Sequence, residues 1–271
     1  MSLNSKEIQL QFEGFLNTPK LWTTTNVYTL KQFKFELKNI LPFNGNILKN
    51  QRLGKRVESF VSFVLNQTDS CKILIENAQI QNNKTTLGEL DCILLQNNTP
   101  VHLEVIYKFY LYDKTVGKNE IEHWIGPNRK DSLVAKLNKL KEKQLPILFS
   151  SFTKPLLKKL NIDIDIIHQQ VLFKAQLFIP YNKEKPKFNL LNKECVKGFY
   201  IHYNQLSQLN DCKFYIPTKL NWLQEIRVPI KWLTYEQFLQ KIKALIQQKT
   251  APLCWLKHPN GNTEKFFVVW W

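Results

Sequence analysis

The sequence predicts a mixed α/β fold of the α+β kind in a folded globular chain of 271 residues. Three observations predict this class. Hydrophobic residues make up 44% of the chain, which is enough to build a core. Between residues 50 and 180, the patterns follow one another as helix, strand, strand, strand, helix and strand. Beyond residue 181, shorter strand patterns alternate with helical ones.

The first 44 residues are expected to form a helical extension. Lys6–Leu16 and Leu30–Leu41 both have the spacing of amphipathic helices. Trp22 and Phe43 are expected to pack this extension onto the main domain.

A clearer helix is predicted over Asn50–Gln67. Its apolar stripe consists of Val57, Phe60, Val61, Val64 and Leu65. Glu58 lies three residues before Val61 and therefore belongs to the buried face. Because a buried, unpaired Glu is costly, Glu58 is expected either to meet a basic partner or to point into a polar site.

The central stretch, Thr86–Tyr110, follows a strand predicted over Cys71–Ile80 and has the pattern of two strands joined by a polar loop. The loop is expected at Gln96–Pro100. The charged side chains in this stretch are three carboxylates and one lysine, namely Glu89, Asp91, Glu104 and Lys108.

Strand side chains alternate between two faces, so Glu89 and Asp91 share one face, and Glu104 and Lys108 share one face. With the turn centred after residue 97, Asp91 lies directly opposite Glu104. Two acids so placed on apolar strands need a proton or a cation, and a divalent cation bound by oxygens is the simplest solution. The structural alternative is that Glu89 pairs with Lys108 while the other two acids face water at a sheet edge.

A long polar connection spans Leu111–Asn128, and loops of this length are usually functional or mobile. Asn128 is placed to cap the helix predicted over Arg129–Leu145. Trp124 is expected either to anchor the loop or to stack on a nucleobase.

The helix over Arg129–Leu145 has leucines at helical spacing, and Gln144 continues their face toward the sheet. The helix is strongly basic, through Arg129, Lys130, Lys136, Lys139, Lys141 and Lys143. These side chains form either a solvated face or the wall of a groove that contacts phosphates.

The remaining pattern predicts a short helix over Phe152–Leu160, a strand over Gln170–Pro180 and a charged linker from Tyr181. Strands are then predicted over Gly198–Tyr203, Leu253–Lys257 and Lys265–Trp270, and a helix over Thr234–Gln248. Five tryptophans supply a core, or an interface if exposed: Trp222, Trp232, Trp255, Trp270 and Trp271. The expected domains are residues 1–44, 45–180 and 181–271.

The net charge of +16, from 38 Lys and Arg against 22 Asp and Glu, suits a polyanionic partner and above all nucleic acid. The alternative is a compositional bias whose lysines only solvate the surface. No apolar run approaches the ~20 residues that span a bilayer, and no signal-peptide segment is evident, so a cytoplasmic location without a membrane partner is expected. The five cysteines contain no CxxC pair, which favours neither zinc nor a disulfide framework.

The order of elements and acids resembles the PD-(D/E)XK nuclease superfamily, whose core is a restriction-endonuclease-like αβββαβ arrangement. The motifs LGELD, HLEVIYKFYL and WIGPNRKDSL and the run KLKEKQL are also similar to the bacterial domain-of-unknown-function family numbered 1853. That family has been grouped with these nucleases by sequence. The likeness covers most of the chain and is strongest over residues 52–146.

The resemblance implies a metal-dependent nuclease acting on nucleic acid, with DNA the favoured substrate. It implies Mg²⁺, or Mn²⁺, held by Asp91, Glu104 and Glu58, with Glu89 assisting. Lys108 would be the catalytic lysine. The superfamily pattern is acid-x-Lys, however, and Ile106 stands where that lysine is expected.

Lys108 lies two residues beyond Ile106, about 6.6 Å along the strand, with Lys84 and Lys136 as other replacements. Gln144 is expected to orient the substrate. The other expected substrate contacts are Lys136, Lys139, Arg129 and Trp124.

Two further functions stay open at this point. One is a non-catalytic nucleic-acid-binding protein on the same scaffold, which the displaced lysine motivates. The other is a protein-interaction module whose Trp-rich C-terminal part meets a protein partner.

Overall fold

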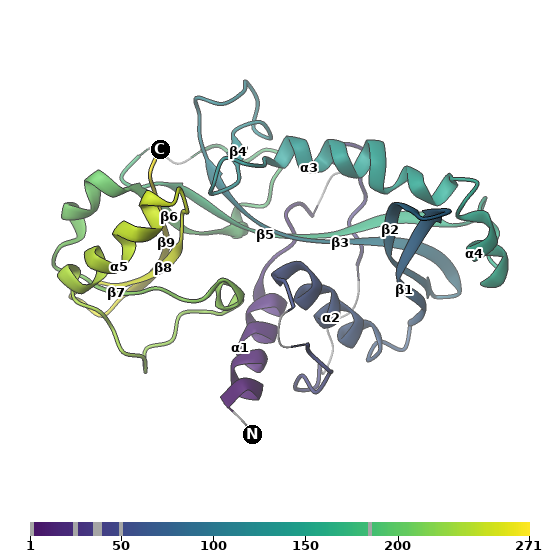
Figure 1. Ribbon diagram of the computed structural model, residues 1–271, viewed down its shortest axis with the longest axis horizontal. Helices are drawn as coiled ribbons and strands as arrows, with labels where there is room; N and C mark the ends of the chain where they lie inside the picture. The colour runs from purple at the N-terminus through teal and green to yellow at the C-terminus, as the bar shows by residue number, and fades with distance from the viewer. Residues whose placement is uncertain (1–2, 24–26, 35–39, 49–50, 184–185) are drawn as a thin grey trace. The chain divides into compact units, whose positions relative to one another are not determined.

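The computed structural model describes residues 3–23, 27–34, 40–48, 51–183 and 186–271 (Figure 1). It has a mixed α+β fold, so the predicted class is confirmed. Within the described residues, eight strands are hydrogen-bonded in the order β1-β2-β3-β5-β6-β9-β8-β7, and a ninth, β4, pairs with β3. Among the described helices, none is long and apolar enough to cross a membrane.

The chain forms two compact units built from interleaved segments. The hairpin unit consists of Lys20–Tyr107 and Ala135–Lys174, and the terminal unit consists of Met1–Pro19, Lys108–Val134 and Ala175–Trp271. The sequence-based domains at 44/45 and 180/181 follow chain order instead. A change in composition marks one position along the chain, whereas a single strand such as β3 contributes residues to both units.

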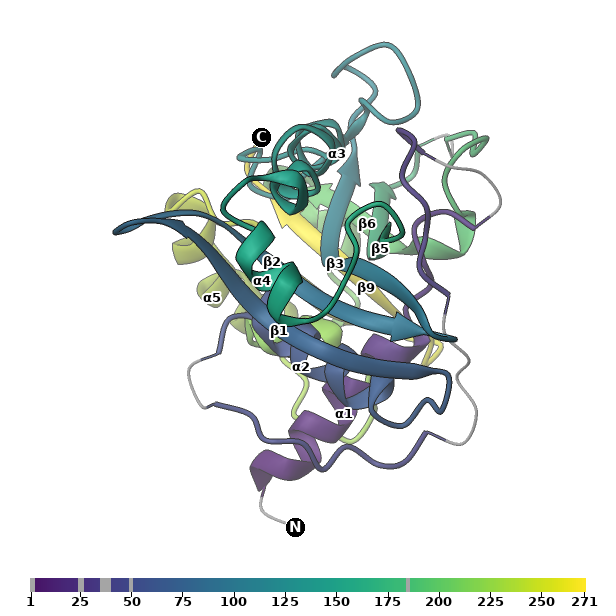
Figure 2. The same ribbon diagram turned by 90° about the vertical axis from the view of Figure 1, so that its right-hand side faces the viewer.

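The hairpin unit is built around α2 (Leu53–Leu65), β1 (Cys71–Asn82), β2 (Thr85–Gln96) and the first part of β3 (Thr99–Tyr112). Figure 2 shows β1 and β2 as one long twisted ribbon. The predicted helix, strand, strand, strand order is therefore confirmed. The later elements of this unit are most of α3 (Leu133–Lys139), η1 (Leu140–Gln144), η2 (Pro146–Phe149), α4 (Lys154–Lys159) and the start of β5 (His168–Pro180).

The turn between β2 and β3 sets the register of the site. Asn97 and Asn98 have φ angles of 47° and 64°, both in the left-handed region that Asn adopts more readily than most residues. Two such residues in succession are typical of a type I′ turn, which matches the twist of a tight hairpin. The resulting pairs run from Gln96↔Thr99 to Cys92↔Leu103.

The helix predicted over Leu30–Leu41 is wrong for residues 30–34, while residues 35–39 lie outside the described residues. Residues 30–34 run beside the start of β5 in an extended form. Gln32 Nε2 donates to the Phe173 carbonyl at 3.1 Å, and Gln32 Oε1 accepts from the Phe173 amide at 3.0 Å. The Phe33 amide donates to the Val171 carbonyl at 2.8 Å. These bonds to β5 replace the i to i−4 bonds of a helix.

The helix predicted over Arg129–Leu145 is shorter and irregular. Asn128 does not cap it, because Asn128 Oδ1 accepts from the Ala251 amide at 2.9 Å and Arg129 has a φ of 53°. Regular α-helix begins at Leu133 and passes into the π-helical segment η1. Pro146 follows, and since proline has no backbone N–H it cannot extend an α-helical ladder.

The terminal unit contains α1 (Leu3–Asn17), β4 (Trp124–Ile125), the end of β5, β6 (Val196–His202), β7 (Lys213–Tyr215), α5 (Tyr235–Gln247), β8 (Leu253–Lys257) and β9 (Thr263–Val269). Its short 3₁₀ helices are η3 (Lys193–Cys195), η4 (Tyr203–Leu209) and η5 (Lys219–Leu223). The predicted C-terminal hairpin is β8 paired antiparallel with β9. Thr234 and Gln237 form a capping box at the start of α5. Trp255 is fully buried and belongs to the core.

Helix α1 packs on η5 within the terminal unit. Gln11 Nε2 donates to Asn221 Oδ1 at 2.7 Å, although 210 residues separate the two in sequence. A Cβ on Gly14 would lie 1.9 Å from the Leu223 carbonyl oxygen, so this close approach of two backbones requires glycine. The helix predicted over Lys6–Leu16 is therefore present and docks on residues near the opposite end of the sequence.

Candidate functional site

Asp91 lies at the end of the paired part of β2 and β3. The register that pairs Cys92 with Leu103 places Asp91 opposite Glu104, one step further along. At this step Asp91 Oδ2 accepts a hydrogen bond from the Val105 amide at 2.9 Å. The carboxylate thus takes up a backbone donor of β3 and is held beside Glu104.

Glu104 is fully buried and both of its carboxylate oxygens accept hydrogen bonds. Gln144 Nε2 donates to Oε2 at 2.7 Å, and His102 Nε2 lies 3.2 Å from Oε1. Gln169 Nε2 donates to His102 Nδ1 at 3.0 Å, so the ring proton of neutral His102 is on Nε2 and points to Glu104. A buried carboxylate is costly when unpaired, and these two donors offset part of that cost.

Glu58, Glu89 and Asp91 form a second group of carboxylates next to this pair. Each offers an oxygen within 4.8 Å of the others, and all three side chains are partly buried. Glu58 comes from α2, whereas Glu89 and Asp91 lie on the same face of β2. We call these three residues together with Glu104 the acid cluster.

Lys55 supplies the positive charge at the acid cluster. Its Nζ donates to Glu58 Oε2 at 2.8 Å and to Asn77 Oδ1 at 2.7 Å, and it also bonds Glu89 Oε1. Burial lowers the pKa of Lys55, but its hydrogen bonds and charge interactions with the two glutamates outweigh that effect and raise the pKa overall. The ammonium therefore stays charged and holds two carboxylates together.

Burial and nearby negative charge raise the pKa values of Asp91 and Glu58. Burial, the charge of Glu104 and the charge of Glu58 raise the pKa of Asp91 to about 7, against the opposing effects of the Val105 amide and Lys55. Burial also raises the pKa of Glu58, against the opposing hydrogen bond from Lys55. Negative charge at the acid cluster is therefore in excess, and a proton or a further cation would relieve it.

Lys108 belongs to the terminal unit and forms an ion pair there. Its Nζ donates to Asp131 Oδ2 at 2.7 Å, with both side chains about two-fifths exposed. Ile106, which stands at the superfamily's lysine position, is buried in the core. Glu89 bonds Lys55, so the alternative of a Glu89–Lys108 pair does not describe its contacts.

The expected substrate contacts fall into three environments. Lys136 Nζ donates to Gln144 Oε1 at 2.7 Å, which links it through Gln144 to Glu104, whereas Lys139 is exposed. Arg129 pairs with Asp113 at 2.8 Å and lies 4.5 Å from the ring centre of Trp271.

Trp124 is fully buried, with its ring packed against Tyr112 and Phe188. The expectation that it stacks on a nucleobase is therefore wrong for this conformation, since a stacking ring needs an exposed face. Its burial agrees with the alternative, which is that Trp124 anchors the loop.

The model of the family described as Domain of unknown function (DUF1853) matches residues 18–269. The chain belongs to the DUF1853 family. A comparison with curated proteins and one with solved structures found no match. The family resemblance drawn from the LGELD and HLEVIYKFYL motifs is thus confirmed, whereas membership of the nuclease superfamily stays a prediction.

Sequence reasoning missed two polar contacts of the acid cluster in this DUF1853 chain, Lys55 and His102, and the residue that orients His102. Lys55 lies three residues before Glu58 on α2, so helical spacing could have identified it. His102 lies two residues before Glu104 on β3, so strand alternation could have identified it as well. Gln169 comes from β5, and no local spacing relates it to His102.

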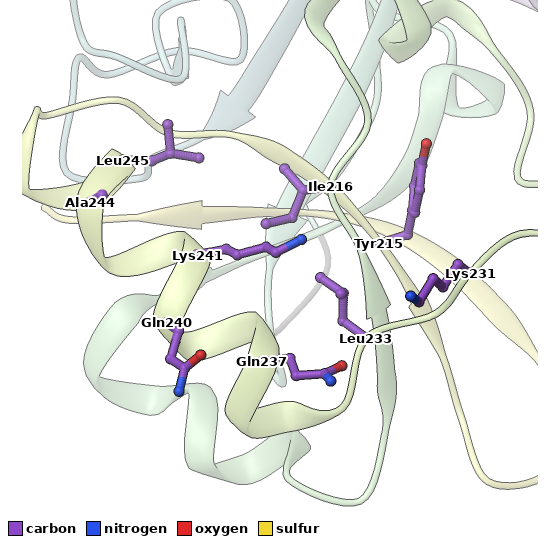
Figure 3. A pocket seen from close by; sticks show the side chains of 9 residues that line it. All are labelled: Tyr215, Ile216, Lys231, Leu233, Gln237, Gln240, Lys241, Ala244 and Leu245. Atoms are coloured by element: carbon purple, nitrogen blue, oxygen red, sulfur yellow. The ribbon is translucent and has the colours of Figure 1, made fainter.

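A separate hollow of about 720 Å³ lies in the terminal unit of the DUF1853 chain, between α5 and the region of β7. Figure 3 shows Lys241 and Gln237 extending from α5 toward Leu233. Its described lining mixes apolar and polar side chains and includes two lysines and no carboxylate. All of its lining residues belong to the terminal unit, whereas the acid cluster belongs to the hairpin unit.

Proposed function

We propose that this protein is a metal-dependent nuclease that hydrolyses phosphodiester bonds in nucleic acid, with DNA the favoured substrate. The observation that carries the proposal is the acid cluster, which gathers four carboxylates, two of them bonded to Lys55, in a chain of net charge +16. A basic chain attracts polyanions, while a compact group of acids repels them unless a cation is present. Metal-assisted phosphodiester hydrolysis accounts for both features.

The donor set suits Mg²⁺ or Mn²⁺. Every candidate ligand is a carboxylate oxygen, and Mg²⁺ binds through a few carboxylates while keeping several waters. Asp91, Glu104 and Glu58 would hold the ion, with Glu89 assisting. Both oxygens of Glu104 accept one hydrogen bond each, which leaves a further lone pair on each oxygen. When bound, the metal supplies charge stabilisation and lowers the pKa of a bound water.

The chain's own residues would prepare the site for that ion. His102 and Gln144 fix the orientation of the Glu104 carboxylate. Asp91, whose pKa is raised to about 7, is about half protonated at neutral pH and would release that proton as positive charge arrives. Without a metal, the Lys55 ammonium is bonded to Glu58 and Glu89. Once a metal binds these carboxylates, the flexible ammonium would be available to a substrate phosphate.

Gln144 and several basic side chains would contact the substrate. Lys139 is exposed and would contact phosphates directly. Lys136 would act through Gln144, to which it donates. Lys108 and Arg129 would need to leave their pairs with Asp131 and Asp113 before meeting substrate. The expected cytoplasmic location stays a prediction from the sequence.

Cleavage of single-stranded DNA, plasmid DNA and structured RNA with Mg²⁺ or Mn²⁺ tests the proposal. Asp91→Asn and Glu104→Gln each remove a charged ligand and nearly keep the shape, so each should lower the rate by orders of magnitude. The matched controls are Asp69→Asn and Glu142→Gln, the same changes at exposed positions. A wild-type protein that cuts none of these substrates with either metal would refute the nuclease.

A second candidate, a non-catalytic nucleic-acid-binding protein, is favoured by the surroundings of Ile106 and Lys108. Ile106 is buried at the expected lysine position, and Lys108 is paired with Asp131. Both candidates predict binding that weakens steeply with salt, because lysine–phosphate contacts release counterions. Lys108→Ala separates them: loss of cleavage with retained binding supports catalysis by Lys108. Binding by the wild type without any cleavage supports the second candidate.

A further inference from the structure

A polar pocket of about 260 Å³ lies in the hairpin unit beside the acid cluster. Helix α2, strand β1 and the segment around residues 43–46 line it. Two of its lining residues tie it to the acid cluster: Glu58 is a member of the cluster, and Lys55 bonds Glu58. Whatever enters this pocket therefore lies next to the carboxylates and the ammonium.

One wall of the pocket is aromatic and held in place. The ring of Phe43 lies 4.8 Å from that of Phe63 and 5.0 Å from that of Phe60, both in edge-to-face contact. A Cβ on Gly45 would lie 2.7 Å from the Phe43 ring, so the ring packs directly over the glycine backbone. Phe43 is only partly buried and lines the pocket.

The rest of the pocket is polar, and some of its polar atoms, Gln51 Oε1 among them, have no hydrogen-bond partner in the described part of the chain. Ser62 donates to Glu76 Oε2 at 3.0 Å, and Gln51 donates to Ser59 at 3.0 Å, so these groups bond one another. By contrast, the side-chain amides of Asn46 and Asn66 have no hydrogen-bond partner among the described residues. A free amide offers both a donor and an acceptor, which is the pairing that the edge of a nucleobase requires.

We propose that this pocket binds one unpaired nucleoside of a single-stranded nucleic acid. The base would lie against Phe43 while Asn46 and Asn66 bond its edge. Glu58 and Glu76 repel phosphate, so the phosphate would stay outside near Lys55, next to the acid cluster. A volume of about 260 Å³ is just below the roughly 300–1,000 Å³ of ligand clefts, so the pocket suits one nucleoside and is too small for a base pair.

This inference deepens the proposed nuclease by naming its substrate class, and the phosphate's place beside the acid cluster rests on that function. The pocket itself does not, because a nucleoside without phosphate needs neither metal nor catalysis. Binding to the pocket can therefore be measured separately from cleavage.

The first experiment titrates the metal-free full-length protein with each of the four uncharged deoxynucleosides by NMR. Saturable binding of at least one is expected. Phe43→Leu keeps apolar contacts but removes the ring, and it should weaken binding by roughly five-fold or more, since base–aromatic stacking is worth that much. Asn66→Leu removes an amide and should also weaken binding, because the edge of the base loses a hydrogen-bond partner. Asn210→Leu is the matched control, because Asn210 and Asn66 are exposed C-cap residues with nearly the same backbone angles.

A wild type that binds none of the four, or variants that bind as well as wild type, would overturn the inference. Asn46→Leu, in an exposed segment, replaces any variant that does not fold. The second experiment compares a fluorescent single strand with its duplex, both without metal. Tighter binding of the single strand, lost in Phe43→Leu and kept in Asn210→Leu, is expected, and equal binding of strand and duplex would overturn the inference.

Failure of the nuclease and failure of the pocket give different results. If nucleosides bind as expected but no substrate is cut, the pocket stands and the proposed catalysis falls. If metal-dependent cleavage occurs but Phe43→Leu changes neither nucleoside binding nor cleavage of single strands, the nuclease stands and the pocket falls.

Discussion

Replacing Asp91 by asparagine should stabilise the protein above neutral pH and change its stability little in acid. The introduced asparagine would keep an oxygen for the Val105 amide, to which Asp91 Oδ2 is bonded at 2.9 Å. Its side-chain N–H group would take the place of the proton on the acid. The substitution therefore imitates protonated Asp91 at every pH and removes the ionised form.

The size of the effect follows from the pKa of Asp91, which burial and the charges of Glu104 and Glu58 raise from 3.8 to about 7. A group whose pKa is raised on folding stabilises the fold fully below its unfolded pKa, and that contribution is lost as pH rises through the folded pKa. At about 1.4 kcal/mol per pKa unit, the loss between pH 4 and pH 8 amounts to about 4 kcal/mol.

Urea unfolding of wild type and Asp91→Asn between pH 4.5 and pH 8, without divalent metal, measures this difference. The free energy of unfolding of the variant minus that of the wild type should grow by about 1.4 kcal/mol per pH unit until pH 7 and then level off. Asp69→Asn, the same change at an exposed position, should show no comparable growth.

A difference that stays constant across this pH range would refute the reasoning, because Asp91 would then titrate alike in the folded and unfolded chain. A variant that loses stability as pH rises would refute it more strongly. Such a result would mean that ionised Asp91 stabilises the fold through an ion pair.

Three further predictions concern the acid cluster and its hairpin. Lys55→Met removes the ammonium from between two glutamates, so it should lower the melting temperature without metal. It should also raise the affinity for Mn²⁺ several-fold, as measured by isothermal titration calorimetry. Unchanged affinity would contradict competition between lysine and metal. Gln144→Leu leaves an oxygen of buried Glu104 without its donor and should cost about 1–3 kcal/mol in urea unfolding, whereas the exposed Lys143→Met should cost little. Asn98 has a φ of 64°, so Asn98→Val should destabilise by about 1–3 kcal/mol while Asn98→Gly should not, and equal melting temperatures would contradict the turn.

Local patterns predicted the part of the site that depends on local rules. Strand alternation and the two asparagines were enough to place Asp91 opposite Glu104, because a two-residue turn fixes the register of a hairpin. Helical spacing placed Glu58 on the inner face of its helix. The basic partner that Glu58 was expected to need is Lys55.

Contacts between distant segments could not be predicted in the same way. The spacing of Leu30 and Phe33, both buried, fits one face of a helix, yet the segment is extended because β5 offers backbone partners. The periodicity of apolar residues in the segment cannot reveal such partners, since the competing hydrogen bonds come from residues about 140 positions away. Gln169, which sets the tautomer of His102, was missed for the same reason.

The docking of α1 on η5 has a consequence for biosynthesis. A ribosome that adds roughly 5–20 residues per second needs about 10–40 seconds to make the 210 residues between Gln11 and Asn221. Throughout that interval Phe12 and Phe15, both buried in the finished fold, lack their final surroundings. Helix α1 is thus the first helix to be synthesised and among the last to reach its final contacts. Its apolar side chains have to be protected in the nascent chain until translation is nearly complete.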